Sequence, residues 1–121
     1  MPVFCMNDKV SFENLASVAE RYPRIPFILA GIGYRTQRII LPLMETFSNI
    51  YLSLGSNMCV HQGIEQLVDK TGPERLLFGT GFPKIEAMCG VTLLMYAGIP
   101  DDAKALIGAG NLAHLVNEIR R

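Results

Sequence analysis

The chain has 121 residues, of which 50% are hydrophobic and 18% are charged. This length and composition exclude a disordered chain and leave room for one core, so residues 1–121 are expected to form a single domain. Eleven basic residues balance eleven acidic ones, which excludes the overall positive field that draws a protein to nucleic acid or to an anionic membrane.

The three cysteines, Cys5, Cys59 and Cys89, are odd in number and show no CxxC spacing. They argue against a disulfide framework and a zinc ribbon, and they favour a reducing compartment. The sequence opens with no signal-peptide pattern and contains no run of about 18 apolar residues. These features predict a soluble cytoplasmic domain.

Short apolar runs alternate with helical stripes from the start of the chain to residue 78. The predicted strands are Val3–Met6, Phe27–Ala30, Ile50–Leu54 and Leu76–Phe78. The predicted helical stripes are Phe12–Tyr22 after an N-cap at Ser11, Ile39–Phe47, and Ile64–Val68 before a C′ glycine at Gly72. Pro42 is expected either to start the second helix or to kink it.

The alternation stops after the fourth strand. Ile85–Ala97 is apolar on nearly all sides, which predicts a buried helix in which Met88 and Met95 fill the core. Asp101 and Asp102 begin a shorter helix. The last helix carries the stripe Leu112, Leu115, Val116 and Ile119, and its Arg120-Arg121 end suits the helix dipole.

This order of elements predicts an α/β fold with a parallel sheet. Functional loops of such a sheet lie at the carboxyl ends of its strands. Those loops are Met6-Asn7-Asp8, Gly31-Ile32-Gly33, Gly55-Ser56-Asn57 and Gly79-Thr80-Gly81. Three of the four are rich in glycine, so this end is expected to be open and poor in side-chain chemistry.

The glycines match no nucleotide-binding fingerprint. Gly31-x-Gly33 lies between a strand and a helix, but Thr36 stands where G-x-G-x-x-G needs its third glycine. Gly108-x-Gly110 follows a helix, and no P-loop segment is present. The amides of Gly79–Gly81 and Gly31–Gly33 are able to hold an anion beside a helix start, although tight turns are the commoner reason for such glycines.

The two histidines add little evidence for a metal site or a catalytic site. Cys59-x-His61 supplies two potential metal ligands or a nucleophile pair, but zinc needs three or four ligands and the pair has no orienting third group. His61 is expected on a βα loop or at the next helix cap, and His114 within a helix, where packing or exposure is the usual role.

Several polar side chains follow the strands and are candidates to face a ligand, although loop charges are more often simply solvated. They are Asp8, Arg35, Asn57, His61, Thr80 and Lys84. The residues taken alone therefore form no catalytic constellation.

Four runs of the sequence nevertheless resemble the C-terminal half of amidohydrolase-related proteins of the amidohydrolase-2 type, which include metal-dependent decarboxylases and lactone hydrolases. The runs are LASVAERYPRIPFILAGIG, NIYLSLGS, IEQLVDKTGPERLLFGTGFP and IGAGNLAHLV. GPERLLFG and the helix that begins near Asn111 are the more specific parts. The resemblance implies half of a (β/α)₈ TIM barrel, with strands five to eight, four parallel βα units and an extra C-terminal helix.

In that family, histidines on several strands bind a metal at the barrel mouth, and an acid follows the last strand. The family segments PVxxH, ILAHxG and LLFGSDxP resemble residues 2–6, 28–33 and 76–83. This places Met6 at one histidine (with Cys5 as the neighbouring alternative), Gly31 at the next and Gly81 at the acid. Glycine offers no ligand atom and a thioether binds zinc or manganese poorly. The resemblance therefore implies vacated positions, no catalytic residue and no metal, with zinc or manganese expected only if this assignment is wrong.

Length is the second departure from the family, because a full barrel takes about 250 residues. Half of a barrel leaves two edge strands unpaired and its inner face open. Such a chain is expected to pair with itself or with a missing N-terminal half-barrel, or to close differently from the parent fold.

Three hypotheses follow. The first is a catalytically degenerate half-barrel that acts through assembly or small-molecule binding. The second is the C-terminal part of an active metal-dependent hydrolase or decarboxylase. The third is an anion- or phosphate-binding module. The three vacated positions favour the first hypothesis over the second and the second over the third. They argue against enzyme activity of this chain alone. Neither nucleic acid nor a membrane is expected as a partner.

Overall fold

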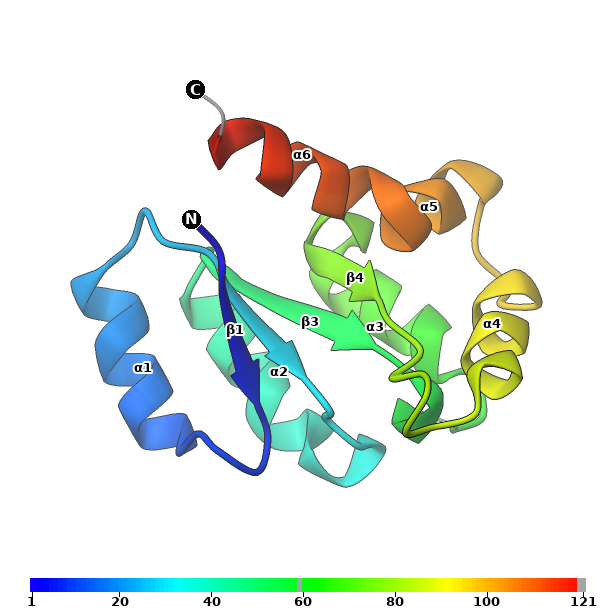
Figure 1. Cartoon of the computed structure of the whole chain (residues 1–121), viewed down its shortest axis with the longest axis horizontal. Helices are drawn as coiled ribbons and strands as arrows, with labels where there is room; N and C mark the ends of the chain where they lie inside the picture. The colour runs from blue at the N-terminus through cyan, green and yellow to red at the C-terminus, as the bar shows by residue number, and fades with distance from the viewer. Residues whose placement is uncertain (59, 120–121) are drawn as a thin grey trace.

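A parallel sheet of four strands forms the centre of the computed structural model, which describes residues 1–58 and 60–119 and only the backbone of Met58 (Figure 1). The strands pair in chain order and are β1 (Val3–Met6), β2 (Phe27–Ala30), β3 (Ile50–Leu54) and β4 (Leu76–Phe78). All four predicted strands are confirmed with the same bounds. The predictions made for Cys59 and for Arg120-Arg121 lie outside the described residues.

Helices follow every strand. The first three units hold α1 (Phe12–Arg21), α2 (Gln37–Thr46) and α3 (Gly63–Thr71), and β4 is followed by α4 (Ala87–Met95), α5 (Asp101–Ala105) and α6 (Asn111–Ile119). A π-helical segment, Leu106–Gly110, joins α5 to α6, and short 3₁₀ turns occupy Tyr34–Thr36, Ser56–Met58 and Pro73–Arg75. Pro42 lies inside α2, so it does not start that helix. Gly72 ends α3 at a φ of 77°, which confirms the predicted glycine stop.

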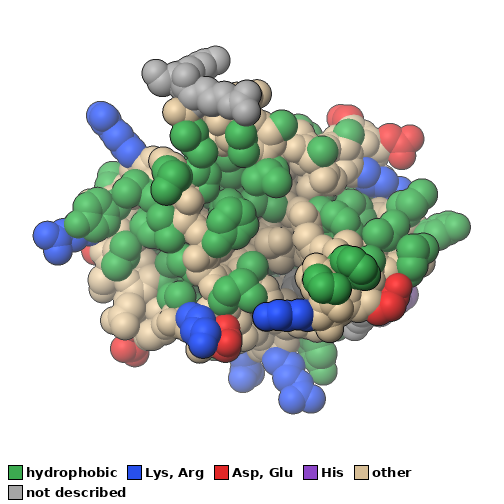
Figure 2. All heavy atoms as spheres, viewed as in Figure 1, with side chains coloured by type: hydrophobic (Ala, Val, Ile, Leu, Met, Phe, Trp, Pro, Cys, Tyr) green, Lys and Arg blue, Asp and Glu red, His purple; other side chains and the backbone are tan. Residues whose placement is uncertain are grey.

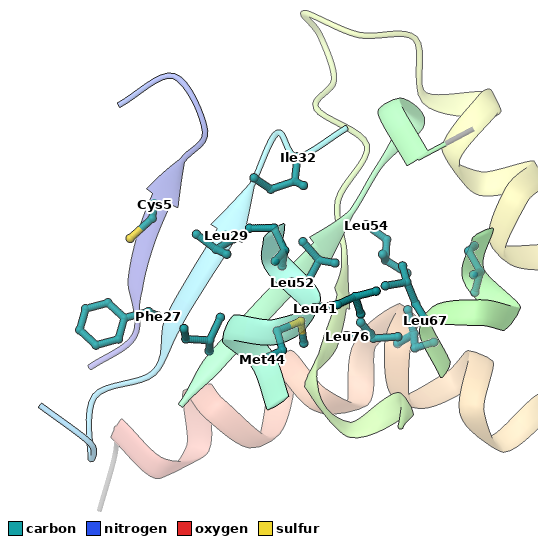
Figure 3. Packing of buried hydrophobic residues seen from close by; sticks show 14 of the residues in the cluster. Cys5, Phe27, Leu29, Ile32, Leu41, Met44, Leu52, Leu54, Leu67 and Leu76 are labelled. Carbon is teal, nitrogen blue, oxygen red and sulfur yellow. The ribbon is translucent and has the colours of Figure 1, made fainter. Parts of the chain in front are cut away.

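The main core lies between the sheet and helices α1 to α3; in Figure 1, α2 and α3 lie behind the strands and α1 lies to the left of β1. We call the face of the sheet that packs against these helices the outer face and the opposite one the inner face. Alternate strand residues point to the outer face, because side chains change face at every position of a strand. Cys5, Phe27, Leu29, Leu52 and Leu76 contribute from the four strands and pack with helical residues such as Leu41, Met44 and Leu67 (Figure 3).

Helix α6 crosses the amino-terminal ends of the strands on the inner face (Figure 1). Its Leu115 packs against Ile28 and Leu77, with Tyr51 beside them. The expectation of a wholly open inner face is therefore wrong for the amino-terminal half of β2 to β4. Strand β1 lies beyond this cover, and its inward-facing Phe4 stays 63% exposed.

The prediction of a buried helix over Ile85–Ala97 is wrong. Helix α4 is shorter and buries only Gly90 and Leu94. Met88 and Met95 are 61% and 65% exposed, so they do not fill the core. An apolar stretch is buried only where another element packs against it, and the exposed side of α4 has no such neighbour among the described residues. Within residues 1–58 and 60–119, no helix is both long and apolar enough to cross a membrane.

Polar side chains fasten each corner where a helix turns into the next strand. The Asn49 amide donates to the carbonyl oxygens of Ala19, Tyr22 and Ile25 at 3.0–3.1 Å, at the end of α1. Arg75 donates to the carbonyl oxygens of Met44 (2.6 Å) and Phe47 (3.0 Å) after α2. Asn111 donates to those of Pro73 (2.6 Å) and Leu76 (2.8 Å) after α3. The Ala19 and Met44 carbonyl groups lie in the last turns of α1 and α2, where a helix leaves carbonyl groups without an intrahelical partner.

At the opposite end of the sheet, β3 and β4 approach one another closely. A Cβ atom added to Gly55 would lie 2.8 Å from the carbonyl oxygen of Gly79. That separation is shorter than a van der Waals contact, so only glycine fits here without a backbone shift. The close approach shapes the carboxyl-terminal edge of the sheet.

The corner contacts predict a large effect for Asn49→Ala, which removes the donor from three carbonyl groups around a buried side chain. We expect the free energy of unfolding to fall by roughly 1–3 kcal/mol, because the Ala19 and Ile25 carbonyl groups lose this donor and the Tyr22 carbonyl keeps only the Ile25 amide. Urea denaturation measures the change. Asn14→Ala, on the exposed side of α1, is the matched control and should change stability by less than about 0.5 kcal/mol. Equal midpoints for the two variants would contradict the role of Asn49.

The close approach at Gly55 predicts that Gly55→Ala costs roughly 1–3 kcal/mol, because the new methyl group must displace the backbone of Gly79. Gly33→Ala is the control, since its Cβ would meet nothing nearer than 3.9 Å and its φ is −92°. Thermal unfolding followed by circular dichroism compares the two. A Gly55→Ala variant as stable as the wild type would show that the two strand ends are not constrained as described.

Candidate functional site

A cavity of about 220 Å³ lies at the carboxyl ends of the strands. Strands β1, β2 and β3 contribute to its wall, together with the segments that follow β2, β3 and β4. The lining residues are Met6, Ala30, Gly31, Ile32, Ser53, Gly55, Ser56, Asn57, Gly79, Thr80, Gly81 and Ile85. The cavity is therefore at the end of the sheet where a parallel α/β fold is expected to bind ligands.

The structure brings together the three positions that the resemblance marks as vacated. Met6, Gly31 and Gly81 all line the cavity, and a Cβ on Gly31 would lie 3.4 Å from the Cε of Met6. Cys5 does not share this position, because its side chain is buried on the outer face. Burial there raises the pKa of the Cys5 thiol, which disfavours the reactive thiolate form.

Backbone conformation separates two of these positions from ordinary residues. Gly31 and Gly81 have φ angles of 72° and 78°. This left-handed region is strained for residues with a side chain and comfortable for glycine. A Cβ on Gly81 would also lie 3.2 Å from the Cδ1 atom of Ile85. The cavity wall is thus shaped around glycine at both positions.

The polar groups of the wall are uncharged. Hydroxyl groups come from Ser53, Ser56 and Thr80, and Asn57 adds an amide. The Ser56 hydroxyl donates to the carbonyl oxygen of Glu86 at 3.2 Å, and the Thr80 hydroxyl accepts from the Phe82 amide at 3.2 Å. Ala30, Ile32 and Ile85 supply apolar surface. Such a wall suits a small molecule with hydrogen-bonding groups and no net charge.

Two of the candidates named from the sequence, Asn57 and Thr80, lie in this wall. Sequence reasoning missed Ser53 and Ser56. Strand alternation could have predicted the direction of Ser53. Ile50, Leu52 and Leu54 are the buried residues of β3, so the residues between them must face the other way. Ser56 depends on the turn after β3, and periodicity gives no signal for a turn residue.

Three charged candidates lie outside the cavity. Asp8 is in the turn after β1, with its carboxylate 3.9 Å from the Lys9 ammonium and both side chains more than two-thirds exposed. Arg35 lies in a 3₁₀ turn, where its Nε donates to the hydroxyl of its neighbour Tyr34 at 3.5 Å. Lys84 is exposed in the loop before α4. None of the three lines the cavity at the strand ends.

His61 lines a separate cavity of about 280 Å³ between the start of α3 and α4, together with Glu65 and Tyr96. A hydrogen bond from the Gly98 amide at 2.6 Å holds the pKa of Glu65 below its usual value, and nearby His61 adds to the effect. His114 is exposed on α6, 3.3 Å from the Glu118 carboxylate. The two histidines therefore lie apart from the site, and Cys59 is outside the described residues.

The helix nearest to Gly79–Gly81 already has an anionic cap. The Glu86 carboxylate accepts hydrogen bonds from the amides of Met88 (2.8 Å) and Cys89 (3.2 Å) at the start of α4. These are the donors that a bound phosphate would use at a helix N-terminus. The described residues of the cavity wall also include neither lysine nor arginine. The surroundings of these glycines thus give little support for an anion.

The residues of the wall do not fit a zinc or manganese ion. They offer one thioether, three hydroxyls and one amide, whereas these metals are held by imidazole, thiolate or carboxylate groups. Among the described residues, no group of three or more His, Cys, Asp and Glu side chains is placed to share a metal.

Solved structures with a similar fold are TIM-barrel proteins. An uncharacterised TIM-barrel protein from Bordetella bronchiseptica matches with a TM-score of 0.79 and 23% identity, over 100% of this chain and 47% of that one. A 2,6-dihydroxybenzoate decarboxylase from Rhizobium matches with a TM-score of 0.64 and 18% identity, over 88% and 42%. A dihydroxybenzoic acid decarboxylase from Polaromonas sp. JS666, with bound manganese and the inhibitor 2-nitroresorcinol, matches with a TM-score of 0.62 and 20% identity, over 91% and 41%.

The chain thus spans less than half the length of these three structures, with four parallel strands alternating with helices, as half of a barrel. A comparison with curated proteins gives no significant match. The model of the family described as amidohydrolase (Amidohydro_2) matches residues 8–113. The chain belongs to the amidohydrolase-2 family and has the fold of half of its TIM barrel.

Proposed function

We propose that this chain is a catalytically degenerate amidohydrolase-like half-barrel that binds a small uncharged molecule in the cavity at the strand ends. The observation that carries the proposal is the convergence of Met6, Gly31 and Gly81 on one cavity wall. The family resemblance assigns two metal-binding histidines and an acid to these positions. A wall that keeps the place of the site and lacks its ligand atoms supports binding without the family's metal chemistry.

The left-handed glycines support the same proposal. A histidine or an acidic residue in place of Gly31 or Gly81 would have to adopt a backbone φ above 70°. That conformation costs roughly 1–2 kcal/mol for a residue with a side chain. The loss of the ligand atoms is thus matched by a backbone that prefers glycine. A single reverse substitution would not recover a relaxed metal site.

The uncharged wall of the cavity favours a neutral ligand over a charged one. A carboxylate placed in this cavity would find no lysine, arginine or metal-binding cluster among the described residues of the wall, and a buried charge without a partner is costly. Hydroxyl and amide groups do suit a neutral hydroxylated ring. The similar structures from Rhizobium and Polaromonas, an enzyme acting on 2,6-dihydroxybenzoate and an enzyme holding 2-nitroresorcinol, make such rings the natural probes.

Assembly is the second way in which a half-barrel without chemistry of its own can act. Within the described part of the chain, strands β1 and β4 each pair with one neighbour only, so both edges of the sheet lack a partner strand. The C-terminal part of an active hydrolase or decarboxylase ranks lower, because the missing ligands belong to this half. An anion-binding module ranks last, because Glu86 already caps α4.

The vacated site predicts that protein purified without chelator holds less than about a tenth of an equivalent of zinc or manganese, because the binding of a structural or catalytic metal needs several deprotonated ligands. Elemental analysis of the folded protein measures the metal content. A sample dialysed against manganese and then against buffer is the control for weak surface binding. Near one equivalent of tightly held metal would contradict the proposal, and Asp8, Cys59 and His61 would then be the ligands to test.

The uncharged wall predicts discrimination between two probes that differ by one carboxylate. We expect resorcinol to shift the amide resonances of Ser53, Thr80 and Gly81, and 2,6-dihydroxybenzoate to bind at least about tenfold more weakly, a difference of about 1.4 kcal/mol. NMR titration measures both affinities.

Ala30→Leu should fill the cavity and abolish the shifts, whereas Ala113→Leu, on the exposed side of α6, should leave them unchanged. Tighter binding of the benzoate would favour the anion-binding hypothesis instead. No binding of either ring would reject the proposed ligand class.

A further inference from the structure

We infer that the Ser53 hydroxyl selects the ligand of the strand-end cavity, and that this ligand is a small neutral ring whose own hydroxyl group bonds to Ser53. The inference rests on the proposed binding function and adds the residue that decides which ring is preferred. It follows from the direction of the Ser53 side chain, from its lack of a bonding partner and from the space beside its hydroxyl.

Strand register places Ser53 on the inner face of the sheet, next to the cavity. Ile28 and Tyr51 are register partners in β2 and β3. Two positions further along both strands, Ala30 therefore lies beside Ser53 on the same face. Met6 on β1 is in turn the register partner of Ala30. These side chains form one row across three strands that lines the cavity, and Ser53 is the polar member of the row.

The Ser53 hydroxyl has no hydrogen-bond partner among the described residues, whereas two other hydroxyls of the wall are engaged locally. Ser56 donates to the carbonyl oxygen of Glu86, and Thr80 accepts from the Phe82 amide. Ser53 is half-buried, but its oxygen is not sealed inside the protein, because no fully buried side-chain oxygen or nitrogen of the described residues lacks a partner. The hydroxyl is therefore accessible from the cavity and free both to donate and to accept.

Glycine at position 79 leaves room beside this hydroxyl. A Cβ atom added to Gly79 would lie 3.2 Å from the Ser53 Oγ and would meet no second side chain of the described residues within 4 Å. The space over Gly79 therefore opens directly onto the Ser53 hydroxyl. A ligand hydroxyl that enters this space comes within reach of a hydrogen bond, since O–H···O bonds span about 2.5–3.0 Å.

Apolar side chains flank this polar position. Met6 on β1 and Ile85 in the loop before α4 line the same cavity and are 48% and 38% exposed. Figure 2 shows hydrophobic side chains gathered over the front of the sheet as well. A hydrogen bond in such surroundings discriminates between ligands, because a polar group that lacks a partner there has also lost water. The geometry therefore favours a compact ring with an apolar body and a hydroxyl that faces β3.

Asn57 is the other polar residue of the wall whose side chain has no partner among the described residues. It is exposed in the 3₁₀ turn after β3, so water competes for its amide. Ser53 is instead held on a strand that pairs on both sides, and its hydroxyl is partly removed from water. A fixed, partly desolvated group decides between ligands better than an exposed one. Selectivity is thus assigned to Ser53 and a supporting contact to Asn57.

A cycle that removes one hydroxyl from the protein and one from the ligand tests this role of Ser53. Resorcinol and 3-methylphenol have nearly the same shape and differ in one hydroxyl group. We expect Ser53→Ala to lower the ratio of their affinities, resorcinol over 3-methylphenol, at least about fivefold, which corresponds to one net hydrogen bond. NMR titration measures the four affinities. Ser17→Ala is the matched control, because the exposed Ser17 hydroxyl donates to the Glu13 carbonyl oxygen on α1, away from the cavity.

Gly79→Ala tests the same contact without removing the hydroxyl, because its methyl group would cover the Ser53 Oγ. Gly79 is not among the glycines with a positive φ, so alanine fits its backbone. We expect the affinity ratio to fall in this variant too, with circular dichroism reporting that both variants fold. If Ser53→Ala fails to fold, Gly79→Ala decides.

A folded Ser53→Ala or Gly79→Ala variant with the wild-type ratio would overturn the inference, and so would a fall that appears only in Asn57→Ala. Either result leaves the proposed binding function standing and removes only the role of Ser53. Failure of the wild type to bind either ring would instead reject the binding function, and this inference with it.

Discussion

The corners of this half-barrel depend on side chains that arrive from a later unit of the chain. A helix that turns into a strand ends in carbonyl groups that the helix itself does not satisfy. Asn49, Arg75 and Asn111 supply the donors, each across 24 to 38 positions of sequence. Each unit is thereby held by the unit that follows it or by the final helix, and the amino-terminal end of the sheet becomes its fixed end.

The opposite end carries the cavity, and its shape follows from glycine. Gly55 lets two strand ends approach within a distance that a methyl group forbids, and Gly31 and Gly81 take a backbone conformation that other residues avoid. The glycines that offer no ligand atom to the wall therefore also shape it. With no charge among the described residues of the wall, the proposed ligand would be recognised by shape and by neutral hydrogen bonds, each of which contributes about 1 kcal/mol.

A half-barrel has two strand edges without a partner and an inner face without a cover. Helix α6 covers part of the inner face, because Leu115 packs over its amino-terminal half against Ile28 and Leu77. Strand β1 remains outside this cover. The cavity and the exposed edges are thus linked, since the wall of the cavity runs from Met6 on edge strand β1 to the loop that follows edge strand β4.

The sequence by itself determined the four strands, the stop at Gly72 and the family, because apolar periodicity, turn residues and short motifs are local signals. It also marked Met6, Gly31 and Gly81 as positions to compare, although only packing could bring them to one wall. The tertiary structure decided which polar residues face the cavity and left α4 exposed against expectation. The reason is physical: burial and convergence depend on elements distant in sequence, and a local pattern carries no record of which neighbour covers which face.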